Sequence, residues 1–350
     1  MTQPAEKRPP LVDKVALKEF LDAHFGVSHE LTMQRHQAGH SNETFFLRYG
    51  TDELVLRRPP NGAFLPSAHD VSREYRVLNA LDSTAVRSPR TVLACDDESV
   101  IGVPFYLMER VDGLVIRSEL PERFDKKARP RLGEEMIDAL AELHAVDLEA
   151  CGLDDFGKKE GYLDRQLRRW SGQLELTLPM TRPVPDLERL GGWLRDNRPG
   201  SPLTTPVHGD YKLDNVMFAH DAPARLVSIL DWEMSTLGDP LADLGWLASF
   251  WLEFGEGDDD VLADLNRVTR LAGLSTRAEL VRRYEDQTGR DASALEWYRV
   301  LATWKLAILL EGSYARHLAG MTDDPFFARM ERDVPALARR GLAIAAGIAS

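Results

Sequence analysis

The sequence has little cysteine and no long apolar run. Its 350 residues include two cysteines, Cys95 and Cys151, which lie far apart and without metal-ligand spacing. Two such thiols are too few for a disulfide framework. Residues 1–10 are polar and lack the apolar core of a secretory signal, while the apolar stretch near 301–310 is interrupted by Lys305 and is too short to cross a bilayer. We therefore expect a cytoplasmic protein with a flexible tail over residues 1–10 and no membrane partner.

An excess of positive charge is also absent. The 43 Lys and Arg residues are outnumbered by 56 Asp and Glu residues, which gives a formal net charge of −13. Nucleic-acid binding depends on cationic side chains that neutralise phosphates, so this balance argues against a nucleic-acid partner. The length suits an enzyme with two cores or with one lobed domain.

The periodicity of apolar residues changes near residue 113. Before this point, alternating and helical patterns predict a helix over 12–25, a β-hairpin over 43–58, a helix over 70–81 and strands over 90–94 and 104–111. After it, they predict long helices over 131–144 and 163–176, one short hairpin over 216–230, and only helices beyond that hairpin. The sequence thus predicts an α+β protein with a small β-sheet N-lobe, residues 11–110, and a larger, mainly helical C-lobe, residues 111–350.

The clearest chemical pattern flanks the single hairpin of the second part. Asp210 and Asn215 stand five positions apart in VHGDYKLDN, residues 207–215, and Asp231 stands in ILDWE, residues 229–233. Phosphoryl transfer needs a carboxylate beside the attacking hydroxyl and oxygen ligands that hold Mg²⁺. The Asp-to-Asn separation matches that of kinase catalytic loops, and the hairpin would return Asp231 to the side of Asn215. Each residue alone also suits the cap of a turn, so only the combination points to chemistry.

These two segments resemble those of the aminoglycoside phosphotransferase and choline kinase family. Within it the chain is most similar to kinase-like domains that occur alone in bacteria or fused to acyl-CoA dehydrogenases. The resemblance implies a two-lobed protein-kinase-like fold and the transfer of the γ-phosphate of ATP to a small-molecule hydroxyl. It further implies that Asp210 is the catalytic base and that Asn215 and Asp231 are the Mg²⁺ ligands. His208 is then better suited to fixing the loop than to acting as the base.

Two segments of the first part suit a nucleotide. The turn that contains Ser41 and Asn42 resembles the short nucleotide loop of the family, although it also reads as an ordinary polar turn. Arg57 aligns with the position where related kinases carry a lysine on the third strand, and Glu74 is its expected ion-pair partner. Arginine stays charged and can bind phosphate through two nitrogens of its guanidinium, which is wider than an ammonium group. An exposed ion pair at the end of a strand is the alternative interpretation.

The stretch from Phe105 to Gly113 resembles the connection between the lobes of such kinases. There the backbone carbonyl of Glu109 and the backbone N–H of Val111 would bind the edge of adenine, with Met108 behind it. A buried edge strand would have the same composition. Farther on, Asp239 is predicted to cap a helix, and by the same resemblance Asp243 reaches back to the backbone of the loop before Asp210.

The acceptor and the oligomeric state remain open at the level of the sequence. Little chain separates Asp231 from the next predicted helix, which leaves no room for an activation loop and argues against protein substrates. Acidic residues over 253–260 suit a cationic, aminoglycoside-like acceptor, whereas arginines beside Trp170 suit an anionic acceptor such as a hydroxyacyl-CoA. A choline-like acceptor is a further option. Charge runs of both kinds also occur on solvated faces. The arginines beside Trp170 are Arg165, Arg168 and Arg169.

The alternative to an enzyme is a pseudokinase-like module that binds nucleotide without turnover.

Overall fold

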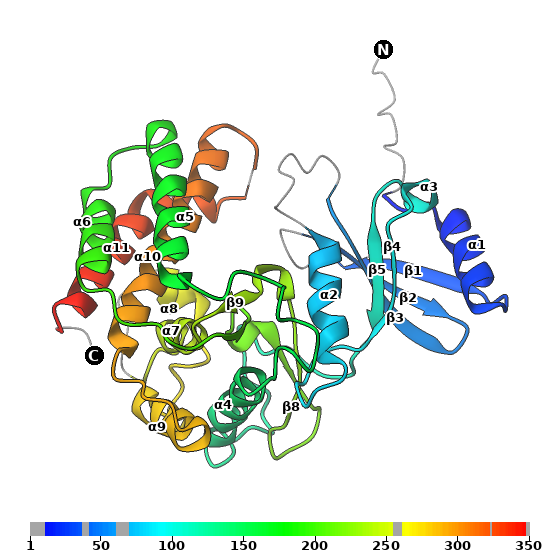
Figure 1. Cartoon of the computed structure of the whole chain (residues 1–350), viewed down its shortest axis with the longest axis horizontal. Helices are drawn as coiled ribbons and strands as arrows, with labels where there is room; N and C mark the ends of the chain where they lie inside the picture. Colours follow the sequence, from blue (N-terminus) through cyan, green and yellow to red (C-terminus); the bar gives the residue numbers. More distant parts are fainter. Residues whose placement is uncertain (1–10, 37–41, 61–69, 255–260, 323, 348–350) are drawn as a thin grey trace. The chain divides into compact units, whose positions relative to one another are not determined.

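The chain folds into two compact units. The structure is a computed structural model that describes residues 11–36, 42–60, 70–254, 261–322 and 324–347. The N-terminal unit comprises residues 1–83 and 88–112, and the C-terminal unit comprises residues 84–87 and 113–350. Figure 1 colours the first from blue to cyan and most of the second from green to red. The short segment 84–87 belongs to the C-terminal unit although its neighbours in sequence do not.

A five-stranded antiparallel sheet forms the centre of the N-terminal unit. Its order is β1-β2-β3-β5-β4, and Gly50, with φ of 62°, turns the chain between β2 and β3. The hairpin predicted over 43–58 is therefore confirmed. The strands are β1 (Leu31–His36), β2 (Glu43–Tyr49), β3 (Asp52–Arg58), β4 (Thr91–Cys95) and β5 (Phe105–Glu109).

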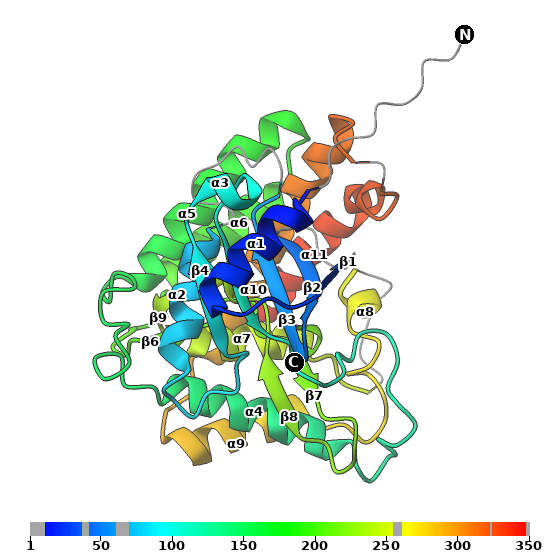
Figure 2. The ribbon, with the colours of Figure 1, turned by 90° about the vertical axis from the view of Figure 1, so that its right-hand side faces the viewer.

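Helices pack against this sheet. Leu56 and Leu107 belong to the core on the face of the sheet that α1 covers (Figure 2). Arg57 and Tyr106, each one position along its strand, contact residues of α2 on the other face. This is the alternation that a pleated sheet imposes on successive side chains. Helix α1 begins after Asp13, whose carboxylate accepts hydrogen bonds from the first turn, as expected for an N-cap. The helices are α1 (Lys14–Phe25), α2 (Val71–Leu81) and the single turn α3 (Glu98–Ile101), which confirms the helices predicted over 12–25 and 70–81.

The C-terminal unit is mainly helical. Helix α10 has 24 residues and contacts α5, α6, α7 and α11, which surround it in Figure 1. It is buried on most sides, so its apolar residues show no single stripe. No helix among the described residues is long and apolar enough to cross a membrane. The helices are α4 (Pro130–His144), α5 (Tyr162–Thr177), α6 (Pro185–Asp196), α7 (Leu241–Phe250), α8 (Val261–Leu265), α9 (Arg277–Thr288), α10 (Leu295–Leu318) and α11 (Met330–Ala345).

Two short ladders interrupt the helices of the C-terminal unit. Strand β7 (Val216–Phe218) pairs with β8 (Leu226–Ile229), as the sequence predicts, and β6 (Thr205–Val207) pairs with β9 (Thr236–Gly238). The second ladder corrects the expectation that the chain is only helical beyond the hairpin. Strands of three residues are too short for apolar alternation to reveal them. Together the ladders place the two ends of the 208–215 loop beside β9 and β8, the strands on either side of residues 230–235.

Candidate active site

The 208–215 loop joins β6 to β7 and carries most of the predicted catalytic residues. Its start is held by Asp243 in the first turn of α7, as predicted. The Asp243 carboxylate is fully buried and accepts hydrogen bonds from the backbone N–H groups of His208 at 2.7 Å and Gly209 at 2.8 Å. Burial alone would raise the pKa of Asp243, but its hydrogen bond with His144 and these donors lower the pKa. The loop is therefore fixed by a charged carboxylate at neutral pH.

Asp243 is supported in turn by a buried chain of polar groups. Its Oδ2 lies 3.4 Å from Nε2 of His144, whose Nδ1 lies 2.8 Å from the hydroxyl of Tyr284. Burial lowers the pKa of His144, so the imidazole is neutral at physiological pH. These three side chains come from α4, α7 and α9 and hold the start of the loop against three helices.

His208 and Gly209 have structural roles in the loop. His208 is fully buried, its Nε2 lies 2.8 Å from the carbonyl oxygen of Leu230, and its Nδ1 accepts from the backbone N–H of Asp210 at 3.2 Å. With both ring nitrogens engaged in this way, His208 ties the loop to Leu230, the residue directly after β8. Gly209 has φ of 86°, and a Cβ there would lie 2.7 Å from the carbonyl oxygen of Met234, so a side chain is excluded.

Asp210 and Asn215 lie in direct contact. Nδ2 of Asn215 donates to Oδ2 of Asp210 at 2.7 Å and to its carbonyl oxygen at 2.9 Å. The amide nitrogen is thus committed to Asp210, which leaves the Asn215 side-chain oxygen turned to other partners. Oδ1 of Asp210 is buried without a hydrogen-bond partner among the described residues. A buried carboxylate oxygen without a partner is costly, and such groups are concentrated at functional sites.

Asp231 reaches the same place from β8. The backbone N–H of Leu230 donates to the carbonyl oxygen of Asn215 at 2.8 Å, so Asp231 directly follows a residue bonded to the loop. Asp231 has φ of 64°, and within the described ranges it is the one non-glycine residue with positive φ. Backbone strain of this kind persists where the surroundings enforce it and is frequent at active sites. The structure therefore brings Asp210, Asn215 and Asp231 together, as the sequence predicts.

Lys212 lies among these acidic groups, and the sequence reading gave it no role. Its Nζ is 2.9 Å from Oδ2 of Asp210 and 3.9 Å from Oδ1 of Asp214, and 5.5 Å from the centre of the Phe250 ring. Burial would lower its pKa, but the charges of Asp210, Asp214 and Asp231 raise it. A permanent cation therefore stands beside the predicted base. Its place two residues after Asp210 was the only sequence signal.

Oxygen donors at this site suit Mg²⁺. Among the described residues no cluster of three or more His, Cys, Asp or Glu side chains could hold a metal by itself. Mg²⁺ usually binds one or two protein ligands and takes its remaining ligands from phosphates and water. The pair formed by the Asn215 oxygen and the Asp231 carboxylate matches this requirement.

Three of the predicted nucleotide residues gather in the N-terminal unit. Nη2 of Arg57 lies 3.1 Å from Oε1 of Glu74, whose side chain is only 2% exposed, and Nδ2 of Asn42 lies 3.5 Å from Oε2 of Glu74. Nη1 of Arg57 also donates to Thr44 Oγ1 at 3.2 Å. The pair is thus mostly buried, unlike the exposed ion pair that was the alternative. Ser41 lies outside the described residues.

The predicted adenine-binding residues lie at the end of β5. Met108 and Glu109 are its last two residues, and Val111 follows two positions later, outside the strand. Because β5 lies between β3 and β4, it is an inner strand and not an edge strand. The backbone N–H of Glu109 already donates to the carbonyl oxygen of Arg90 at 2.9 Å.

Comparison with known proteins gives consistent relatives. A model described as the phosphotransferase enzyme family matches residues 32–298. Acyl-CoA dehydrogenase family member 11 of Rattus norvegicus is 34% identical over 340 residues, which cover 93% of this chain and 42% of that protein. Acyl-CoA dehydrogenase family member 10 of Mus musculus is 36% identical over 312 residues, which cover 87% of this chain and 28% of that protein. The chain therefore spans less than half the length of these curated relatives.

Solved structures agree with this family. A candidate aminoglycoside phosphotransferase of Ralstonia eutropha superposes with a TM-score of 0.81 at 32% identity, covering 96% of this chain and 99% of that one. A thermostable mutant of the aminoglycoside phosphotransferase APH(4)-Ia, in complex with ADP and hygromycin B, superposes with a TM-score of 0.58 at 16% identity, covering 96% and 99%. The second likeness shows a shared fold, so the predicted α+β kinase-like fold is confirmed. On this fold and these matches, the chain belongs to the phosphotransferase enzyme family.

Proposed function

We propose that the protein is a Mg²⁺- and ATP-dependent kinase that phosphorylates a hydroxyl group of a small molecule. The observation that carries the proposal is the contact between Asp210 and Asn215, with Asp231 placed beside them by the β7–β8 hairpin. A module that only binds nucleotide has no physical need for this convergence. Support also comes from APH(4)-Ia, whose structure with ADP and hygromycin B shows what this fold accommodates.

In this proposal each residue has one task. Asp210 accepts the proton of the attacking hydroxyl, and Asn215 keeps the carboxylate in place through its 2.7 Å hydrogen bond. The Lys212 ammonium, 2.9 Å from Asp210, offsets negative charge near the transferred phosphoryl group. Mg²⁺ would be held by Asn215 and Asp231 and would supply charge neutralisation of the phosphates. Arg57 would hold the nucleotide phosphates while Glu74 orients it.

A coupled assay of ADP formation tests this function. Purified protein with ATP and MgCl₂ should form ADP faster when the correct hydroxyl compound is added from a library that holds aminoglycosides, choline-like alcohols and hydroxyacyl-CoA thioesters. Mass spectrometry should then find one phosphate added to that compound. Stoichiometric nucleotide binding without ADP formation for any library member would favour the pseudokinase-like alternative.

The charges around helix α5 give the library an order. Arg165 bonds to the backbone carbonyls of Lys158 and Glu160, so its guanidinium supports its own loop. Arg168 and Arg169 are exposed, and the Arg169 guanidinium lies 5.2 Å from the centre of the Trp170 ring. These two exposed cations favour testing anionic acceptors, such as hydroxyacyl-CoA thioesters, first. Of the predicted acidic run, residues 255–260 lie outside the described part of the chain.

Replacing Asp231 by Asn should raise the Mg²⁺ concentration needed for half-maximal ADP formation by at least about tenfold, because a charged ligand is lost. Asparagine tolerates the left-handed backbone of this position, so the change isolates the charge. The matched control is Asp221→Asn, in the exposed turn of the same hairpin. An unchanged Mg²⁺ requirement in Asp231→Asn would remove this residue from the proposed metal site.

Replacing Arg57 by Ala should weaken ATP binding by about tenfold or more, because one charge-assisted hydrogen bond contributes about 1.5–3 kcal/mol. Arg57→Lys should recover part of this loss, since a lysine occupies the position in related kinases. Calorimetric titration with a non-hydrolysable ATP analogue measures both effects. Arg48→Ala, on the exposed end of β2, is the control, and equal affinities in all four proteins would contradict the assignment.

A further inference from the structure

Lys305 is a buried lysine that points at the 208–215 loop from α10. Its Nζ donates to the carbonyl oxygen of Gly209 at 2.7 Å, and the residue is 8% exposed. Two aromatic rings accompany the ammonium, with the centre of Trp246 at 4.2 Å and that of Trp170 at 5.6 Å. No carboxylate forms an ion pair with Lys305 in the part of the chain that the structure describes.

This environment is unfavourable for a charged lysine. Burial lowers the pKa of Lys305 to about 8, although the charges of Asp210 and Asp243 act in the opposite direction. The nearby cations Arg169 and Lys212 lower the pKa further. An apolar residue of similar length would fill the same space without the cost of desolvation. A lysine at such a position points to a role in function and not in stability.

The group that Lys305 holds is the peptide directly before the proposed base. The N–H of Gly209 donates to Asp243, and its carbonyl oxygen accepts from Lys305, so both ends of this residue are fixed from different helices. Gly209 cannot carry a side chain, and the loop at this point therefore depends on such contacts for its position. A rotation of the peptide after Gly209 would move the Asp210 carboxylate out of line with the hydroxyl.

We propose that Lys305 is a positioning residue for phosphoryl transfer, which fixes the Gly209–Asp210 peptide and thereby aims the Asp210 carboxylate at the acceptor hydroxyl. This inference rests on the proposed kinase function. Lys305 acts through the backbone of the loop, and the two tryptophan rings lie beside its ammonium group. Displacing a reacting group by about 1 Å lowers rates by about 100-fold, so loss of this hydrogen bond has a large effect on turnover.

The test compares the 350-residue protein with Lys305→Met, and with Lys127→Met as a control for loss of an exposed ammonium. ADP formation from ATP and MgCl₂ is measured with water alone and with any acceptor found in the library. We expect kcat to fall by about 10- to 100-fold in Lys305→Met, while KM for ATP changes by less than about threefold. Hydrogen exchange should become faster in peptides covering 208–215, and the thermal midpoint should stay equal or rise.

ADP formation and hydrogen exchange, measured on the same proteins, separate this inference from the proposed function. Unchanged exchange in 208–215, or faster exchange with unchanged kcat, would overturn the positioning role. A lower thermal midpoint with faster exchange throughout the C-terminal unit would also overturn it, because it would show a merely structural role. If the wild type forms no ADP with any acceptor, the proposed function fails, and the exchange experiment alone then decides whether Lys305 holds the loop.

Discussion

Asp210→Asn is expected to lower kcat for phosphoryl transfer by about 100- to 10,000-fold, the usual contribution of a general base. The change keeps the shape of the side chain and removes its ability to accept the proton. Asn215 can still donate to the new amide oxygen, so the loop should keep its position. Affinity for ATP and MgCl₂ should therefore change little, and the loss should appear in kcat rather than in KM.

Two measurements accompany this variant. ADP formation is followed under saturating ATP, and nucleotide affinity is measured by titration in the absence of acceptor. Asp196→Asn, at the exposed end of α6, serves as the control for replacement of a carboxylate. The free energy of unfolding of the variant is measured as well, because Asp210→Asn removes the charge that pairs with Lys212 at 2.9 Å. Retained turnover in Asp210→Asn would refute the assignment of the base.

The pseudokinase-like alternative makes the opposite prediction for the same variant. If the protein binds nucleotide without turnover, Asp210→Asn changes neither ADP formation nor the fate of any acceptor. The buried ion pair between Arg57 and Glu74 is compatible with either view, since both need bound nucleotide. The convergence of Asp210, Asn215 and Asp231 is what separates them, because in the proposed kinase it would serve chemistry at the γ-phosphate.

Most of the fold was predictable because its signals are local. The β2–β3 hairpin follows from alternation around Gly50, and α1 follows from an apolar stripe between Asp13 and Gly26. The β6–β9 ladder was missed, because each of its strands has three residues and its partner lies about thirty residues away. Short ladders of this kind depend on the tertiary structure around them.

The same contrast between local signals and tertiary contacts applies to the candidate site. Spacing within one segment was enough to join Asp210 to Asn215, and the hairpin was enough to add Asp231. The left-handed backbone of Asp231 has no signature in a single sequence, since an aspartate in ILDWE is also compatible with an extended strand. Lys305 contacts Gly209 across a sequence separation of 96 residues, and no local pattern on a buried helix predicts such a contact. The sequence therefore identifies the reacting groups better than the groups that position them.

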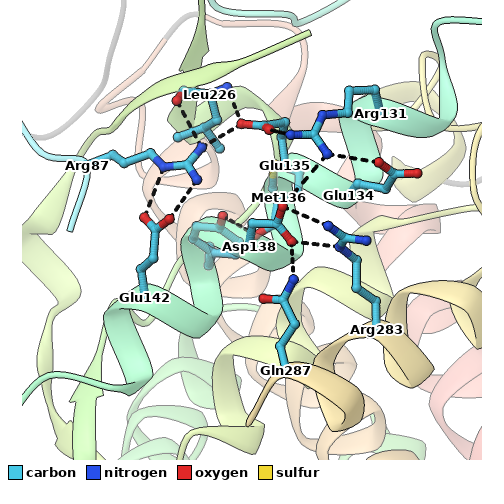
Figure 3. A network of polar contacts seen from close by, with 11 residues as sticks. Arg87, Arg131, Glu134, Glu135, Met136, Asp138, Glu142, Leu226, Arg283 and Gln287 are labelled. Carbon is cyan, nitrogen blue, oxygen red and sulfur yellow. Dashed lines mark hydrogen bonds and ion pairs between the residues drawn. The ribbon is translucent and has the colours of Figure 1, made fainter. Parts of the chain in front are cut away.

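The network around α4 illustrates support that only the structure reveals. Tyr211, next to the proposed base, donates its hydroxyl to the carbonyl oxygen of Met136 at 2.6 Å. Figure 3 shows that α4 also carries Glu135, directly before Met136, and Asp138 and Glu142, after it; all three bind arginines from other segments. Glu135 also accepts from the backbone N–H of Leu226 at 2.8 Å, at the start of β8. The same helix thus supports the loop and the strand that leads to Asp231.

Arg87 links this helix to the hairpin, and Arg87→Met is expected to lower the free energy of unfolding of the C-terminal unit by about 3 kcal/mol. Its guanidinium binds Glu142 through two nitrogens at 2.6 and 2.9 Å and Glu135 at 2.5 Å (Figure 3). Its carbonyl oxygen accepts from the backbone N–H of Ile229 at 2.7 Å, two residues before Asp231. Methionine fills similar space but leaves the largely buried Glu135 with less compensation and Glu142 without its arginine partner.

Urea unfolding followed by tryptophan fluorescence measures this change in the correct unit, because all seven tryptophans lie beyond residue 169. Arg225→Met, exposed and adjacent to β8, should stay within about 0.5 kcal/mol of the wild type. The double variant Arg87→Met with Glu142→Gln should lose less free energy of unfolding than the sum of the two single losses, since both changes remove the same ion pair. If Arg87→Met matches Arg225→Met in stability, the network does not support the hairpin. If only stability falls and the Mg²⁺ requirement is kept, β8 positions Asp231 without help from Arg87.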